Sequence, residues 1–212
     1  MNNISEGGGF VEIPASKRSI TQRKLIHGIG INDADYDVHP TINGKRLLCQ
    51  FYRTWNGMVR RCYSEKSQDK QPSYIGCTVS RDWLLFSNFK KWMVMQDWEG
   101  KSLDKDILFQ GNKVYAPDKC IFVTVAINSL LTNRTALRGN CPQGVCFHKG
   151  HNKFRARCSF NGGRKFIGYY NTPEEAHEAY KAFKYKHIAE VANQQSEPLR
   201  SALLAYKIEG DI

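Results

Sequence analysis

The chain has 212 residues, enough for one large domain or two small ones, and its 41% hydrophobic and 12% aromatic content can build a buried core. The formal net charge is +11, and a chain this basic usually binds a polyanion, most often nucleic acid. No run of about 18 apolar residues is present, which excludes a membrane-spanning helix. The first residues form no apolar signal segment, so we expect a cytoplasmic protein.

The N-terminal half begins with polar segments and continues with two helices. Residues 1–24 are rich in Gly, Ser and Asn and carry clustered Lys and Arg, which predicts a flexible basic arm. Asp33, Asp35 and Asp37 alternate, so they share one face of a strand or lie in a polar loop. Residues 50–63 and 82–96 carry apolar side chains at helical spacing, and the two apolar stripes should pack together. Arg60 and Arg61 lie off the first stripe, either solvated or facing phosphates.

The middle of the chain changes to strand-like patterns. We expect a strand over residues 103–108, a turn at 110–112, a second strand over 120–124 and a helix from residue 126. Residues 132–142 are polar and aperiodic, which predicts a linker between two domains.

The last third predicts three short strands followed by one long helix. In the strand KFRARCSF, apolar and basic side chains alternate, so Lys153, Arg155, Arg157 and Ser159 share one face. Asn161-Gly162-Gly163 suits a tight hairpin, and Thr172-Pro173-Glu174-Glu175 is typical of a capped helix start. The apolar stripe of the helix should cover the apolar face of the sheet and leave the basic face exposed.

The seven cysteines are scattered and include no CxxC pair, whereas a four-ligand zinc site needs closely spaced ligands. We therefore expect reduced, mostly buried thiols. The loosely spaced Cys141, Cys146, His148 and His151 are the alternative, as a set of zinc ligands.

The motifs of the last third resemble the Apetala-two/ethylene-response-factor DNA-binding domain. The shared pieces are Gly144-Val145, the basic strand, the hairpin, the strand FIGYY and the helix start TPEEAHEAY, which together span about a quarter of the chain. The resemblance implies that the sheet enters the major groove of duplex DNA. Cys146 stands where plant proteins usually carry an arginine, and Phe166 replaces the usual Trp, so their base preference is not carried over. The residues that would face DNA on this basis are His148, Arg155, Arg157, Ser159, Arg164 and Phe166.

The segment LDKDILFQGNKVYAPDKCIFVTVAIN resembles the core of His-Asn-His (ββα-metal) homing endonucleases of bacteriophages, which often carry an Apetala-two-type module downstream. Lys105 stands where that family has its general-base His and Lys119 where it has its central Asn, whereas Asn128 fits the last position. Two interpretations remain open. Either Asp104 and Asp106, with or without the cluster at residues 33–37, bind Mg²⁺ and Lys105 assists, or the fold only grips DNA and the carboxylates pair with lysines.

Together these patterns predict an α+β protein whose N-terminal domain contains a ββα-like element and whose C-terminal domain packs a three-stranded antiparallel sheet on one helix. The expected segments are a basic arm (1–24), a divergent endonuclease-like domain (25–131), a linker (132–142), an Apetala-two-type domain (143–195) and a C-terminal tail (196–212). The candidate catalytic residues are Asp104, Lys105, Asp106 and Asn128, with Mg²⁺ on Asp104 and Asp106, and the candidate DNA-binding residues are Arg60, Arg61, His148, Lys153, Arg155, Arg157, Ser159, Arg164 and Phe166.

The expected partner is double-stranded DNA rather than a membrane, in the host cytoplasm if the protein comes from a phage. Two other functions stay open: a non-catalytic DNA-binding regulator or host-directed phage factor, and an RNA-binding protein that stacks bases on its sheet.

Overall fold

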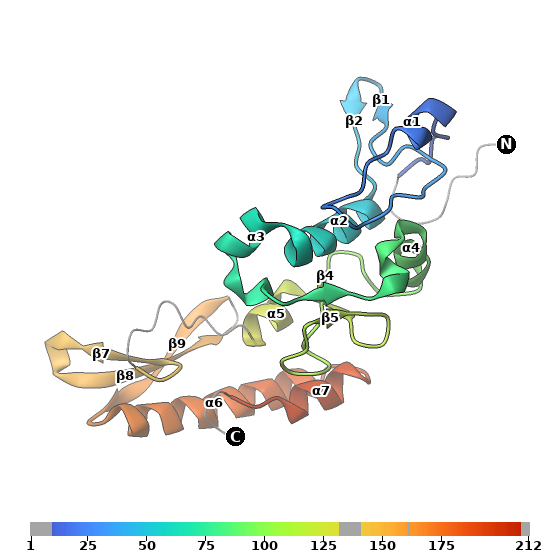
Figure 1. Ribbon diagram of the computed structural model, residues 1–212. Coiled ribbons are helices and arrows are strands. Elements are labelled where there is room, and N and C mark those ends of the chain that lie inside the picture. The colour runs from blue at the N-terminus through green and yellow to red at the C-terminus, as the bar shows by residue number, and fades with distance from the viewer. Residues whose placement is uncertain (1–9, 132–140, 161, 209–212) are drawn as a thin grey trace. The chain divides into compact units, whose positions relative to one another are not determined.

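The computed structural model describes residues 10–131, 141–160 and 162–208, and it confirms an α+β fold (Figure 1). The chain forms two compact units. Within the described ranges, unit 1 holds residues 10–106 and 111–122, and unit 2 holds residues 107–110 and 123–208. Each unit has its own hydrophobic core.

Unit 1 is built around helices α2 (Gln50–Tyr63) and α4 (Phe86–Val94). The apolar stripe that the sequence showed on α2 is buried, with Trp55 and Met58 fully enclosed. Trp55 packs on Phe86 of α4 with ring centroids 5.5 Å apart. Its indole N–H donates to the Trp83 carbonyl at 2.7 Å, so this large ring is buried without an unsatisfied polar atom. The predicted packing of the two helices is confirmed.

Short elements surround this helix pair. They are the helices α1 (Lys17–Thr21) and α3 (Glu65–Lys70), the 3-10 turns η1 (Pro72–Tyr74) and η2 (Arg81–Leu84), and the strands β1 (Thr41–Ile42), β2 (Lys45–Arg46), β3 (Thr78–Val79), β4 (Ser102–Asp104), β5 (Val114–Tyr115) and β6 (Ile121–Val123). Three two-stranded sheets result, in which β1 pairs with β2, β3 with β5 and β4 with β6.

The segment expected to be a flexible basic arm is partly ordered against unit 1. Residues 1–9 lie outside the described residues, whereas Lys17–Thr21 form helix α1, capped by the Ser16 side chain. The Arg23 guanidinium donates to the carbonyls of Asn32, Ala34 and Tyr36. A single arginine that binds three carbonyls fixes both its own segment and the one it contacts, which composition alone does not indicate.

The strand expected over residues 103–108 is shorter in the structure, because β4 ends at Asp104. Asp104 Oδ1 accepts the Asp106 N–H at 2.9 Å, and the Asn112 side-chain amide donates to the carbonyls of Lys105 and Val114 at 2.6 and 2.8 Å. These side-chain contacts turn the chain out of the strand.

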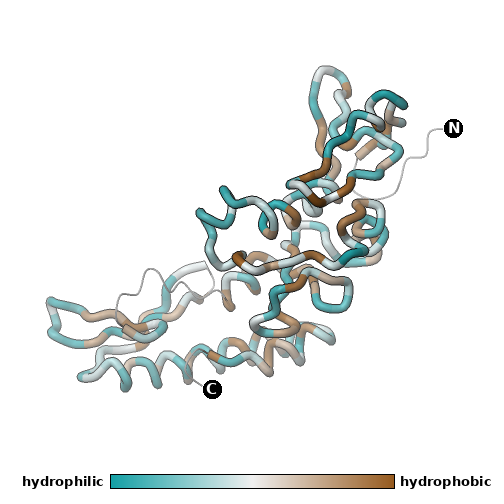
Figure 2. The backbone as a smooth tube through the Cα atoms, in the orientation of Figure 1, coloured by the Kyte–Doolittle hydropathy of each residue, from teal (hydrophilic) through white to brown (hydrophobic). Residues whose placement is uncertain are grey.

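Unit 2 contains the predicted three-stranded sheet and long helix. Strands β7 (Val145–His148), β8 (Lys153–Phe160) and β9 (Gly163–Tyr170) pair antiparallel in that order, and η4 (Lys149–His151) joins the first two. Helix α6 (Pro173–Ala192) packs along one face of the sheet (Figure 1). It begins with the predicted capping box between Thr172 and Glu175. Hydrophilic and hydrophobic residues are interspersed along α6 (Figure 2), and its buried residues recur at helical spacing but include Lys184 and His187 beside Tyr180 and Ile188.

The ends of unit 2 differ from the boundaries expected from the sequence. Helix α5 (Val125–Leu131) belongs to unit 2, and the buried Lys184 ammonium of α6 donates to its Leu130 carbonyl. Most of the expected linker, residues 132–140, lies outside the described residues. The expected C-terminal tail forms helix α7 (Leu199–Ala205), and Ile208 is only 1% exposed in the core of the sheet and α6. Residues 209–212 of that tail are also outside the described part.

Candidate nucleic-acid interface

The sheet of unit 2 has one apolar and one polar face, as the alternation in β8 predicted. Ala156 and Cys158 are buried and contact the core formed with Ala176 and Tyr180 of α6. Side chains at the intervening positions point to the opposite face, because successive strand residues alternate sides. Helix α6 covers only the apolar face, so the polar face has the orientation that a binding surface needs.

Cross-strand pairing brings cations and rings together on the polar face. Cys146, Arg155 and Tyr169 are direct partners across β7, β8 and β9, and Arg157 pairs with Phe166. The remaining partners on this face are His148 with Lys153 and Ser159 with Arg164. The predicted sheet residues therefore lie on one surface together with Cys146 and Tyr169. We call this surface the outer face: Cys146, His148, Lys153, Arg155, Arg157, Ser159, Arg164, Phe166 and Tyr169.

An irregularity in β9 determines which ring lies on the outer face. Ala156 pairs with Gly168 but Arg157 pairs with Phe166, so Ile167 is an extra residue opposite β8. A bulge of this kind resets the alternation of side chains. Ile167 consequently packs against the core, whereas Phe166 is 48% exposed beside Arg157.

Four rings form a cluster at one end of the outer face. Tyr169 lies 4.4 Å from His151, 5.3 Å from His148 and 5.0 Å from Phe166, measured between ring centroids. His148 Nδ1 accepts the His151 N–H at 3.3 Å, which fixes the turn between β7 and β8. The sequence marked His151 only as a candidate zinc ligand and not as part of this face, because it lies in the η4 turn. Tyr169 joins the face only through the bulge.

The cations of the outer face are not neutralised by the protein. Among the described residues, no carboxylate lies within ion-pair distance of Arg155, Arg157, Arg164 or Lys153. Arg155 Nη2 donates to Cys146 Sγ at 3.5 Å, and this contact raises the pKa of Arg155. The guanidinium therefore stays charged at neutral pH, and an external anion is a suitable partner for it.

The candidate catalytic segment is held by internal contacts. The Lys105 side chain is 7% exposed, and its ammonium lies 3.0 Å from both Asp106 Oδ2 and the Asn112 carbonyl. Burial by itself lowers the pKa of Lys105, but the hydrogen bond and charge of Asp106 outweigh it, so the pKa is raised. A lysine held protonated in this way is not available as a base.

The other predicted residues belong to other elements of the fold. Asn128 is in α5 of unit 2, whereas Asp104, Lys105 and Asp106 belong to unit 1. Asp33 accepts hydrogen bonds from the backbone and hydroxyl of Ser87 at 2.8 and 2.5 Å, beside the start of α4. Within residues 10–131, 141–160 and 162–208, no three His, Cys, Asp or Glu side chains are gathered to hold a metal ion. All seven cysteines are free.

The chain was compared with known families, sequences and structures. No protein-family model, curated protein or solved structure matches it. Over the described residues, no helix has both the length and the apolar character needed to cross a bilayer.

Proposed function

We propose that this protein binds double-stranded DNA through the outer face of the β7–β8–β9 sheet. The observation that carries the proposal is the row of cations on β8 and β9, in which Lys153 and Arg164 are exposed and Arg155 and Arg157 half-buried. Exposed Phe166 lies beside the row, and no described carboxylate pairs with it. Such a surface meets the two requirements for DNA recognition, which are positive charge for phosphates and side chains that reach base edges.

The roles of the residues follow from their chemistry and position. Arg155 and Arg157 are two residues apart on the central strand, and the planar guanidinium group binds the acceptors of guanine in the major groove. Phe166 offers an apolar contact to a thymine methyl group. Lys153, Ser159 and Arg164 lie toward the ends of the strands, where they would contact phosphates.

The test is a binding titration of the whole chain with a short labelled duplex, followed by fluorescence anisotropy. Each base contact is worth about 1–3 kcal/mol, so Arg155→Gln with Arg157→Gln should weaken binding by about tenfold or more. The control is Lys186→Gln with Arg200→Gln, which removes two exposed cations from the helices of the same unit. Equal loss in both double variants would show that only net charge matters and would reject the outer face.

Binding of single-stranded nucleic acid is a second candidate, favoured by the cluster of His148, His151, Phe166 and Tyr169. Unpaired bases stack on exposed rings, whereas bases within a duplex do not. The same titration with single-stranded RNA and DNA of equal length separates the two. Stronger binding to a single strand, lost in Phe166→Leu, would replace duplex DNA as the ligand.

We restrict the proposal to binding, because the contacts of Lys105 with Asp106 and Asn112 favour a structural role for that segment. Incubation with duplex DNA and Mg²⁺ should therefore give a complex without cut products. Mg²⁺-dependent cleavage that disappears in Asp104→Ala and Asp106→Ala would restore the endonuclease function instead.

A further inference from the structure

A basic cavity lies in unit 1, and its lining includes no residue of the outer face, which belongs to unit 2. It measures about 580 Å³ and is formed by the end of α2, by α3 and by the η1 turn. Its size falls in the range of small-ligand pockets. The charged residues in its lining are all cations, namely Arg60, Arg61, Lys66 and Lys70, and no carboxylate lines it. The lining also includes Tyr74.

Arg61 is held in place before any ligand arrives. Its guanidinium carbon lies 5.5 Å from the centroid of the Tyr74 ring and 5.6 Å from that of Tyr115, and its Nε donates to the Tyr115 hydroxyl at 3.1 Å. Burial lowers the pKa of Arg61, but the neighbouring Tyr115 and Tyr74 raise it by more than burial lowers it. The guanidinium therefore stays charged. No described acceptor binds its Nη1 or Nη2. A fixed guanidinium with two free nitrogens loses little conformational entropy when it binds an anion.

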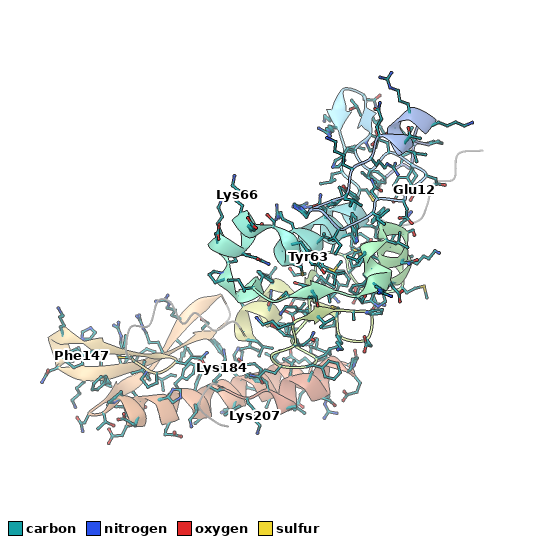
Figure 3. All side chains as sticks on the ribbon, in the orientation of Figure 1. Glu12, Tyr63, Lys66, Phe147, Lys184 and Lys207 are labelled. Atoms are coloured by element: carbon teal, nitrogen blue, oxygen red, sulfur yellow. The ribbon has the colours of Figure 1, made fainter. Side chains whose placement is uncertain are left out.

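The other cations of the cavity lack internal counter-charges. No described carboxylate forms an ion pair with Arg60, Lys66 or Lys70. The helix dipole accounts for Arg60 and Arg61 in the last turn of α2, because cations are favoured at C-terminal ends. It does not account for Lys66, which lies in the first turn of α3, four residues before Lys70. Figure 3 shows the Lys66 side chain projecting away from α3.

Cations that repel one another across a cavity are stabilised by a multiply charged anion. Phosphate oxygens match the planar fork of arginine, and lysines supply point charges around it. The volume is larger than a lone phosphate needs, and the Tyr74 ring offers one wall for a sugar or base.

From this geometry we propose that the cavity of Arg60, Arg61, Lys66 and Lys70 binds the phosphate groups of a nucleotide unit. The ligand is either a free nucleotide or a phosphodiester segment of a nucleic-acid strand, which present the same chemistry. This site goes beyond the proposed function, since it does not depend on the sheet.

The experiment uses the full chain carrying Arg155→Gln and Arg157→Gln, so that the sheet contributes little. Calorimetric titrations with adenosine triphosphate (without Mg²⁺) and with oligothymidylate provide the two sources of phosphate. Arg61 is left intact because it packs in the core region, and Arg60→Gln, Lys66→Gln and Lys70→Gln are combined instead. The matched control combines Lys45→Gln, Arg46→Gln and Arg53→Gln, three exposed cations of the same unit outside the cavity.

We expect at least one probe to bind, and the cavity triple variant to lose at least about tenfold in affinity while the control triple changes by less than about twofold. Binding of the nucleotide identifies a free ligand, and binding of the oligonucleotide alone identifies a strand. The proposal is overturned if neither probe binds or if both triple variants weaken binding equally. Duplex binding by the outer face is measured in a separate titration. A negative result for the cavity therefore does not bear on the outer face, and a negative result for the outer face does not bear on the cavity.

Discussion

The sharpest test of the fold of unit 2 is the substitution Gly144→Ala. Gly144 precedes β7 with φ +80, and a Cβ atom built there would lie 2.1 to 2.5 Å from three carbons of the Tyr180 ring. The ring is buried against Ala156 and Ala176 in the core of this unit, so it cannot simply swing away. The substitution therefore combines a strained backbone with a steric clash in the core.

The two contributions can be estimated separately. A left-handed backbone costs a residue with a side chain about 1–2 kcal/mol, and overpacking a core costs about 1–3 kcal/mol. We therefore expect Gly144→Ala to lower the free energy of unfolding by about 2–5 kcal/mol. For a unit of this size that corresponds to a fall in Tm on the order of 10 °C or more.

Gly162→Ala isolates the backbone contribution. Gly162 has nearly the same φ, +77, but nothing lies within 4 Å of its added Cβ. Thermal and urea denaturation of both variants, followed by circular dichroism, should show a loss of about 1–2 kcal/mol for Gly162→Ala and clearly more for Gly144→Ala. Equal losses in the two variants, or a Gly144→Ala protein as stable as the parent, would refute the close packing of Tyr180 on the entrance to β7.

Two further predictions concern buried lysines. Burial lowers the pKa of Lys184 in the folded protein. At pH values between this lowered pKa and the ordinary lysine pKa, the unfolded chain binds more protons than the folded protein. The contribution of Lys184 to the free energy of unfolding therefore rises with pH over this range. Urea denaturation should show the wild type gaining on Lys184→Met as the pH approaches about 10.5, and a pH-independent difference would contradict the burial of the ammonium. For Asp106→Asn, we expect a loss of about 1–3 kcal/mol in the free energy of unfolding, because the enclosed Lys105 ammonium loses the negative charge of its ion-pair partner and keeps only neutral acceptors there. The exposed control Asp118→Asn should change stability by less than about 0.5 kcal/mol, and the role of the pair is rejected if the two variants behave alike.

The sheet and helix of unit 2 were predictable because several local signals agree there. The alternation in β8 placed Arg155 and Arg157 opposite Ala156, and the capping box at Thr172 fixed the start of α6. Tyr169 was a candidate only as a base-stacking ring, and strict alternation would have placed it on the opposite face from Phe166. The bulge at Ile167, which brings both rings to the outer face, has no distinct sequence signature.

In the middle of the chain, the spacing of apolar residues predicted a longer strand than the structure has. Ile107 and Leu108 looked like the continuation of a strand, but the hydrogen bonds of Asn112 turn the chain at Lys105. These contacts join residues seven positions apart through side-chain amides and an ammonium, which periodicity does not detect. The candidate catalytic segment therefore contains the expected Lys105 and Asp106, but these residues contact each other and Asn112.

The course of the backbone through the two units has a practical consequence for dissecting them. Residues 107–110 belong to unit 2 although residues on both sides of them belong to unit 1, and the Gln110 side chain exchanges two hydrogen bonds with the backbone of Lys207. A fragment spanning only residues 143–195, the boundaries suggested by the motifs, would lack Ile208, α5 and this bridge. Cleavage of any single peptide bond would likewise fail to release either unit complete, because each unit is built from two separate stretches of the chain. Expression trials should therefore keep the chain whole, or join the two stretches of one unit by circular permutation.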